Sequence, residues 1–350
     1  MKKKMNEKWL PHIIAVGALA VFIILGVASA SSPSTLTVQK FDNAETLKDY
    51  LDSQSANNTY NPIKIAVTTD DSMLKDIVEV IKSANKYVDL NLSGNSLTNI
   101  PPNLFEDCTV ITSITLPDNT EALKVFLDCS PANSPDKPVK VTMPVIDSTL
   151  KNVVNVIKSA NKYVNLNFSG YGLTNIGKDA FKDCKYLAVL NIPSSVKKID
   201  VSAFFGLDNL MAINVSSGNE NFSSKDGILY NKDKTILVKF PSGKTGSFEI
   251  DAHRIYSYAF DGSNLSSIKM MGGVVAWYGG TLEPSPMIME NAFINCSKLT
   301  KVTIEYGGPY FLGRNFDGNF MEVYSNSGQM SSDAAGIYTR EIGSNTWKKQ

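Results

Sequence analysis

Residues 187–209, LAVLNIPSSVKKIDVSAFFGLDN, are the clearest copy of a unit of about 23 residues that recurs along this chain of 350 residues. Related fragments occupy residues 108–117, 210–215, 248–270 and 291–304. The apolar positions of the clearest copy are Leu187, Leu190, Ile192, Val196, Ile199, Ala203, Phe204 and Leu207. A unit this short cannot bury its apolar face alone, so neighbouring copies must stack into a solenoid. Leucine-rich repeats, with roughly 20–29 residues and one strand per repeat, fit this period.

A second, longer repeat occupies the first part of the chain. The segment IKSANKYVDLNLSG (81–94) returns as IKSANKYVNLNFSG (157–170), an offset of 76 residues from position 81 to position 157. The same offset pairs residues 46–57 with 122–133 and residues 97–108 with 173–184. Residues 44–119 and 120–195 are therefore tandem copies of one module.

Both modules predict the same succession of elements. An amphipathic helix at the start is followed by a polar, proline-containing loop and a short strand, IKIAV (63–67) or VKVTM (139–143). The apolar positions predict a second helix, which ends near Asn85 or Asn161. These positions are Leu74, Ile77, Val78 and Ile81, repeated as Leu150, Val153, Val154 and Ile157. The predicted fold class is α/β: a leucine-rich-repeat solenoid with a parallel β-sheet along one face, preceded by two tandem helix-containing modules.

The order I-P-x-x-V-x-x-I-x-x-x-A-F-x-x-C, then L-x-x-L-x-I, resembles the BspA-like (treponemal-type) leucine-rich repeat family of bacterial surface proteins. The matching residues are Ile192, Pro193, Val196, Ile199, Ala203 and Phe204, then Ile176, Gly177, Ala180, Phe181 and Cys184, then Ala292, Phe293 and Cys296. The resemblance covers about residues 85–305 and departs at Leu104-Phe105, in the shortened unit 248–260 and in the glycine-rich segment 271–288.

The resemblance also implies how the second part of the chain is organised. It implies repeats over residues 187–305 with a hairpin insertion at 219–244, and we expect the glycine-rich segment 271–288 to form a loop. Residues 306–350 are expected to form a capping tail, because end repeats must be shielded from solvent. Family membership would imply a cell-surface or secreted interaction role, often adhesion to host matrix proteins or to other bacteria.

The first 30 residues have the order of a secretory signal. A basic segment, residues 1–12, precedes the apolar run 13–27, and Ala28-Ser29-Ala30 is a small-residue cleavage site. An uncleaved membrane anchor is the alternative, because the apolar run approaches the ~20 residues that span a bilayer. We therefore predict a signal peptide at 1–30, a linker at 31–43 and export from the cytoplasm.

Charge and composition exclude several classes of protein. The chain has 34 Lys+Arg and 34 Asp+Glu, so it lacks the basic excess with which proteins contact phosphates, and no nucleic-acid partner is expected. Four cysteines are too few for a dense disulfide scaffold. Cys108, Cys184 and Cys296 occupy the same repeat position as Leu207 and Ser263, which predicts small interior residues, whereas Cys129 is either a free thiol or half of a bridge.

The sequence predicts no enzyme, no metal site and no cofactor. Only His253 remains after the signal is removed, and a single histidine at a repeat turn does not support multi-histidine metal binding. Gly243-Lys244-Thr245 lacks the upstream glycine of a phosphate loop, because Val238 stands there. An envelope glycan hydrolase is the remaining enzymatic alternative, but no pair of carboxylates has a reason to converge.

The predicted ligand-binding residues lie on the strands and in one loop. Between inward positions, each strand has one outward side chain: Asn91, Thr115, Asn167, Asn191, Asn214, Glu249, Lys269 and Thr303. Such a row offers repeated hydrogen bonds to a protein or glycan surface, although its residues are equally those of an ordinary solvated strand. Trp277 and Tyr278 are the second candidates, as exposed aromatic anchors or as packing against the solenoid.

The predicted function is that of an exported, non-enzymatic adhesin with a protein or glycan ligand. A periplasmic or membrane-anchored scaffold is the alternative, and in that case the membrane is contacted only through the uncleaved signal segment. Sequence alone does not identify the ligand or the oligomeric state.

Overall fold

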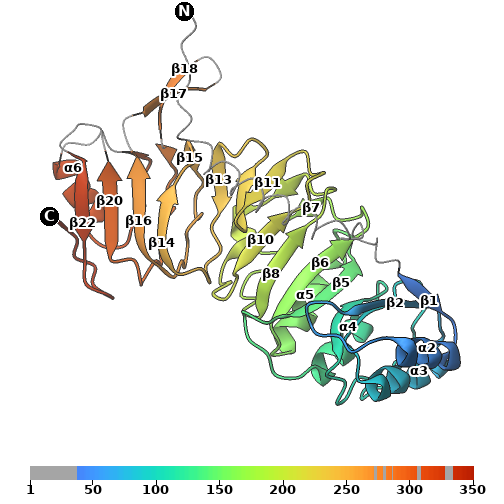
Figure 1. The fold of residues 1–350 in the computed structure, drawn as a ribbon. Helices are drawn as coiled ribbons and strands as arrows, with labels where there is room; N and C mark the ends of the chain where they lie inside the picture. The colour runs from blue at the N-terminus through green and yellow to red at the C-terminus, as the bar shows by residue number, and fades with distance from the viewer. Residues whose placement is uncertain (1–37, 272–273, 279–280, 286, 306–308, 328–333) are drawn as a thin grey trace, which may run out of the picture. The chain divides into compact units, whose positions relative to one another are not determined.

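The computed structural model describes residues 38–271, 274–278, 281–285, 287–305, 309–327 and 334–350 (Figure 1). The predicted signal peptide, residues 1–30, lies outside this range, as does most of the predicted linker. Within the described residues, no helix is both long and apolar enough to cross a membrane. The description below concerns the unit Lys40–Gln350 and the short strand that leads into it.

The largest sheet has eight strands, and their order in the sheet is their order in the chain (Figure 1). The strands are β1 (Gln39–Phe41), β2 (Ile63–Val67), β3 (Val88–Asn91), β4 (Ile111–Thr115), β5 (Val139–Pro144), β6 (Val164–Ser169), β8 (Leu187–Ile192) and β10 (Ala212–Val215). From β2 onward every neighbouring pair is parallel. Parallel strands in sequential order, joined by right-handed crossovers, place all connections on one side of the sheet. We call the opposite side the strand face.

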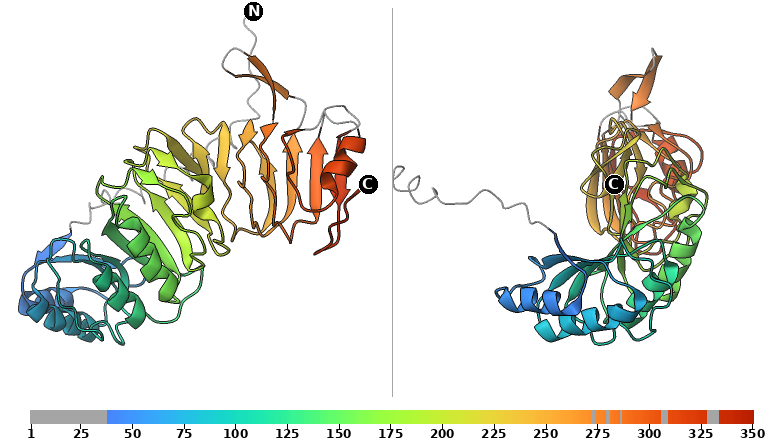
Figure 2. Two further views of the ribbon diagram at one scale, coloured as in Figure 1. Left: turned by 180° about the vertical axis from the view of Figure 1, so that it is seen from behind. Right: turned by 90° about the vertical axis from the view of Figure 1, so that its right-hand side faces the viewer.

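Four helices form the longer connections: α2 (Ala44–Ser53), α3 (Asp71–Ala84), α4 (Thr120–Cys129) and α5 (Leu150–Ser159), along one side of the sheet (Figure 2). Their apolar positions pack with inward strand residues such as Leu90 and Leu166 in one hydrophobic cluster. The helix residues buried there include all eight apolar positions predicted for the second helices, together with Leu47, Leu51, Leu123, Phe126 and Leu127 of α2 and α4. The amphipathic pattern read from the sequence is confirmed.

The two modules close their polar loops in the same way. Asn57 Nδ2 donates to the Tyr87 carbonyl at 2.7 Å, and the Tyr87 amide donates to Asn57 Oδ1 at 2.9 Å. Asn133 and Tyr163, 76 residues later, repeat both bonds at 2.7 and 2.9 Å. An asparagine side chain thus supplies a donor and an acceptor to the backbone of the residue that immediately precedes β3 or β6.

The later repeats form two further sheets. One contains β14 (Gly246–Ile250), β16 (Leu265–Met271) and β20 (Lys301–Glu305) in parallel, followed by antiparallel β22 (Gly336–Thr339) and β23 (Lys348–Lys349). The other contains β11 (Phe222–Lys225), β12 (Ile228–Asn231), β13 (Ile236–Lys239), β15 (Arg254–Ile255), β19 (Met287–Ile288) and β21 (Tyr310–Phe311). Short β7 (Asn175–Ile176) pairs with β9 (Lys198–Ile199), which precedes the 3-10 helix η2 (Val201–Phe204).

The segment 219–244 contains three strands, where the sequence resemblance implied a hairpin. Strand β12 pairs antiparallel with β11 on one side and with β13 on the other, and β13 then pairs in parallel with β15. The third strand of the insertion therefore enters the stack of the following repeats.

Segment 271–288, which was expected to form a loop, contains two strands. Its backbone forms the antiparallel strands β17 (Val274–Tyr278) and β18 (Thr281–Ser285). The run VVAWY has the β-branched and aromatic composition of a strand, and the glycines stand on either side of it in the sequence.

Stacked phenylalanines run through the interior of the later repeats. The ring centroids of Phe240, Phe260, Phe293 and Phe316 follow one another at 5.0, 4.6 and 4.7 Å. Helix α6 (Phe320–Asn326) continues this cluster, and buried Tyr338 and Trp347 pack against its first residue, Phe320, each at 5.2 Å. Identical positions of successive repeats lie above one another in a solenoid, so one residue type can stack along its length.

Candidate ligand-binding face

Polar side chains lie in register across six parallel strands of the largest sheet. The Cα pairing runs from Asn91 to Thr115, Thr142, Asn167, Asn191 and Asn214, one residue on each of β3, β4, β5, β6, β8 and β10. We call these six residues the polar row. Five of them are predicted site residues, which the structure brings together on the strand face. Sequence reasoning missed Thr142, although it stands between the inward residues Val141 and Met143 and the alternation of the strand could have identified it.

Hydrogen bonds between neighbouring side chains orient the row. Asn191 Nδ2 donates to Asn165 Oδ1 at 2.7 Å and to the Leu166 carbonyl at 3.1 Å. Asn214 Nδ2 donates to Asn191 Oδ1 at 3.0 Å, and Asn167 Nδ2 donates to the Thr142 hydroxyl at 3.3 Å. Among the described residues, the side-chain oxygens of Asn167 and Asn214 accept no hydrogen bond, so two acceptors remain for a ligand.

The other three predicted strand residues form a separate row on another sheet. Glu249, Lys269 and Thr303 are Cα partners on β14, β16 and β20. Lys269 Nζ lies 3.1 Å from Glu305 Oε1 and 3.4 Å from Glu249 Oε1. The hydrogen bond to Glu305 raises the pKa of the Lys269 amine. These partly exposed charges satisfy one another and, as surface ion pairs, add little stability.

The two rows do not form the continuous ladder that the sequence suggested. The amide of Ile213 on β10 donates to the carbonyl of Gly227, in the turn between β11 and β12, at 2.8 Å. Gly227 has a φ of +75°, and a Cβ there would lie 2.7 Å from Ala212 Cβ. The insertion therefore occupies the edge of β10 that a further repeat strand would need.

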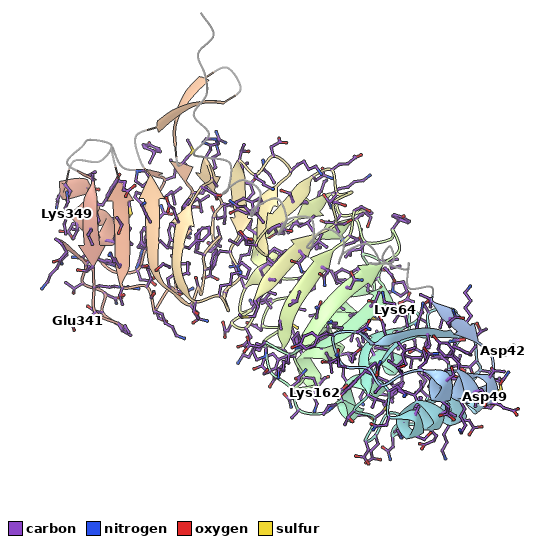
Figure 3. The ribbon with its side chains drawn as sticks, viewed as in Figure 1. Asp42, Asp49, Lys64, Lys162, Glu341 and Lys349 are labelled. Atoms are coloured by element: carbon purple, nitrogen blue, oxygen red, sulfur yellow. The ribbon has the colours of Figure 1, made fainter. Side chains whose placement is uncertain are left out.

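A pocket of about 480 Å³ lies where β6, β8 and β10 end. The polar row enters it through Asn167, Asn191 and Asn214, and the turns after the strands add Tyr171, Ser194 and Ser216. Among the described residues that line it, none is Asp, Glu, Lys, Arg or His. In Figure 3 the labelled Asp42 and Asp49 lie beside β1 and α2, and Glu341 and Lys349 beside β22. The pocket is therefore a neutral part of the strand face, rich in amides and hydroxyls.

Tyr171 is a candidate binding residue that sequence reasoning missed. Its side chain is 83% exposed at the rim of the pocket. It stands between Gly170, with a φ of +79°, and Gly172, where a Cβ would lie 2.3 Å from Ile146 Cγ2. A tyrosine between two glycines directly after a strand was the available signal, because such a turn projects the ring from the surface.

Trp277 and Tyr278, the other predicted anchors, belong to strand β17. Their side chains lie outside the described residues, and their predicted role stays a prediction.

The cysteines have the positions that the repeat pattern predicted for the interior. Cys108, Cys184 and Cys296 are buried, and burial raises the pKa of the Cys184 and Cys296 thiols to about 12. Cys129 is a half-buried free thiol whose Sγ lies 3.4 Å from the Pro102 carbonyl. In the described part of the chain, no group of three or more His, Cys, Asp or Glu could hold a metal ion.

Stacked parallel strands, an interior phenylalanine row and a recurring short unit define a leucine-rich repeat protein. Residues 70–143, 154–285 and 253–319 match the BspA type leucine rich repeat region, in six copies. The chain belongs to the BspA-type leucine-rich repeat family, as the sequence resemblance indicated. A comparison with curated proteins finds no match.

Three solved structures are similar to this chain. A leucine-rich repeat protein from Eubacterium ventriosum is 21% identical over 67% of this chain and 61% of its own, with a TM-score of 0.30. A leucine rich cell surface protein from Faecalibacterium prausnitzii is 20% identical over 77% and 65%, with a TM-score of 0.35. The pneumococcal vaccine antigen PcpA is 16% identical over 76% and 70%, with a TM-score of 0.31. This chain therefore spans less than two thirds of the first two proteins.

Proposed function

We propose that this protein is an exported, surface-exposed adhesin that binds a host matrix protein or another bacterium through the strand face of its largest sheet. It acts by recognition rather than by catalysis. The observation that carries the proposal is the polar row, an uncharged and hydrogen-bonded series of side chains on six adjacent strands.

The polar row suits multi-point recognition. Its residues repeat at the strand spacing of about 4.8 Å, so a single extended ligand can meet several of them in succession. The backbone beneath them is fixed by parallel pairing, and several side chains are fixed by bonds to their neighbours. A rigid surface loses little conformational entropy on binding, which favours affinity.

Two sequence features support export to the surface. The basic and apolar segments of residues 1–30 have the order of a secretory signal. Membership of the BspA-type family supports an interaction role at the cell surface.

The buried, protonated thiols support a non-enzymatic role, because a catalytic cysteine needs an accessible thiolate. His253, the one histidine of the described chain, is exposed at a turn between repeats, and the polar row contains no titratable side chain that could act as a general acid or base.

The proposal is tested by binding of the full chain to immobilised matrix proteins and to whole bacterial cells. One variant carries Asn167→Lys and Asn214→Lys, which place two charges on exposed positions of the polar row. The matched control carries Asn152→Lys and Asn155→Lys, the same change of charge on exposed positions of α5. We expect saturable binding by the wild type and the control, and at least a tenfold loss in the row variant.

Equal loss in both double variants would assign the effect to net charge and contradict recognition through the row. If no matrix protein and no cell surface is bound by the wild type, the adhesin proposal is wrong. Secretion is measured separately, by the mass of the N-terminus after export, with residue 31 as the expected first residue.

A further inference from the structure

The two tandem modules differ in the turn that follows the strands β3 and β6, and in the second module this turn borders the pocket at the ends of β6, β8 and β10. Asn95 in the first module corresponds to Tyr171 in the second, at the offset of 76. Asn95 is buried, donates to the Val67 and Leu92 carbonyls at 2.8 and 3.1 Å, and accepts from the Thr69 amide at 2.7 Å. The second module replaces this satisfied polar residue with a tyrosine that is 83% exposed.

A second substitution adjoins the first. Ile146 occupies the position of Asp70, whose carboxylate caps α3 by accepting from the Ser72 and Met73 amides at 2.9 and 3.1 Å. Helix α5 has no side-chain cap, and it begins at Leu150, three residues later than the position equivalent to the start of α3. Ile146 is 45% exposed.

Both substitutions remove a stabilising contact and expose an apolar side chain in its place. An N-cap and a satisfied buried amide each stabilise the folded chain. The two changes meet in space, because Gly172, next to Tyr171, leaves just enough room for Ile146 Cγ2. Folding gives no reason for this cluster, since the first module closes the same corner with polar residues.

The chemistry of the adjoining pocket indicates what this corner faces. Its polar groups are amides and hydroxyls, and its described lining has no charged side chain. Asn214 Oδ1 and the hydroxyls of Ser194 and Ser216 offer acceptors and donors without charge. A volume of about 480 Å³ falls in the range of pockets for small ligands. A neutral sugar ring matches this chemistry, because it has hydroxyls at its edge and an apolar face of C–H groups that packs on an aromatic ring.

We propose that the pocket at the ends of β6, β8 and β10 binds a neutral sugar unit of a surface glycan, with Tyr171 against the apolar face of the ring and Asn167, Asn214 and the two serines at its hydroxyls. Ile146 extends the apolar platform beside Tyr171. The inference rests on the proposed function, because it names the chemical class of ligand that one end of the polar row recognises.

The test is binding of the full chain to an array of neutral hexose and N-acetylhexosamine oligosaccharides, with sialylated and sulfated forms of the same chains beside them. Titration calorimetry then gives the affinity for the best neutral oligosaccharide. Tyr171→Asn installs the residue of the first module, and Asn214→Ala removes one amide. Tyr60→Asn is the matched control, because Tyr60 is 96% exposed and does not line this pocket.

We expect binding of neutral oligosaccharides, at least a tenfold loss in Tyr171→Asn, a loss of about two- to tenfold in Asn214→Ala, and no change in Tyr60→Asn. Thermal unfolding of each variant shows whether the fold persists. We expect Tyr171→Asn to remain folded, because the Tyr171 side chain is exposed and its removal leaves no cavity. Preference for the sialylated or sulfated forms would overturn the neutral class.

Failure of this inference is distinguishable from failure of the proposed function. If no oligosaccharide binds but matrix protein or cells bind through the polar row, the sugar proposal is wrong and the adhesin proposal stands. Oligosaccharide binding that is unchanged in Tyr171→Asn and Asn214→Ala would likewise overturn the pocket as the site.

Discussion

Lys239 makes the stability of this protein rise with pH in the mildly alkaline range, the opposite of a lysine whose pKa is raised by a partner charge. The side chain, on β13, is 1% exposed, and its Nζ donates to the Tyr258 and Asp261 carbonyls, each at 3.2 Å. Burial lowers the pKa of the Lys239 amine from 10.5 to about 8, and the charge of Asp261 opposes this shift.

The sign of the effect follows from proton binding in the two states. Between about pH 8 and pH 10.5 the unfolded chain keeps this proton while the folded chain has released it, so the free-energy cost of burying this amine decreases as pH rises. One pH unit of such a difference is worth about 1.4 kcal/mol. From pH 7 to pH 9 the contribution to the free energy of unfolding therefore grows by about 1.3 kcal/mol.

The assay is urea unfolding of the wild type and of Lys239→Met at pH 7, 8 and 9, followed by circular dichroism. The buried thiols of Cys184 and Cys296, whose pKa is raised to about 12 by burial, destabilise the fold as pH rises above about 9, but they are present in both proteins. The difference in unfolding free energy between wild type and variant should therefore shift by about 1.3 kcal/mol in favour of the wild type between pH 7 and pH 9. Lys64→Met, at an exposed position of β2, measures the effect of losing a surface lysine. A difference that stays constant across this range would refute a lowered pKa for Lys239.

Three further outcomes are expected. Gly227→Ala should lose about 2–4 kcal/mol of unfolding free energy, because the residue has a φ of +75° and its Cβ would lie 2.7 Å from a side chain of β10. Gly262→Ala, at a φ of +68° but with nothing within 4 Å, should lose only about 1–2 kcal/mol, and equal losses in urea unfolding would show that the close approach does not matter. Phe293→Ala should lose about 3–5 kcal/mol, since the ring stacks between two others at 4.6 and 4.7 Å; a loss below about 1 kcal/mol would mean that the phenylalanine row does not support the later repeats. Iodoacetamide on the native protein should modify Cys129 first, with the three buried thiols protected until unfolding, and mass spectrometry showing rapid modification of a buried thiol would contradict their interior positions.

Periodicity predicted the elements of this fold well, because it reports which face of each element is buried. The apolar spacing of Leu74, Ile77, Val78 and Ile81 corresponds to the buried face of α3, and the outward position of Asn91 follows from strand alternation. The shared repeat position of Cys184 and Cys296 predicted their burial for the same reason.

Pairing between distant segments could not be read from the sequence. The outward residues Asn214 and Glu249 have the same local pattern, yet they belong to different sheets, because the turn at Gly227 takes the hydrogen bond that β10 would offer to a next strand. The run VVAWY (274–278) was predicted to lie in a loop because of the glycines on either side, although its β-branched and aromatic residues favour a strand.

The sequence by itself determined that this chain is a duplicated module followed by leucine-rich repeats, because local periodicity and self-similarity are properties of the chain. Only the tertiary structure decided where the site lies. Thr142 joins the polar row through the register of β5. Tyr171 lines one pocket with Asn191 and Asn214, and the neighbouring Gly172 lies against Ile146, because the crossovers bring the ends of these strands to one corner. Contacts between residues about 25 positions apart depend on strand register, and register is fixed by the packing of the whole sheet rather than by any one segment.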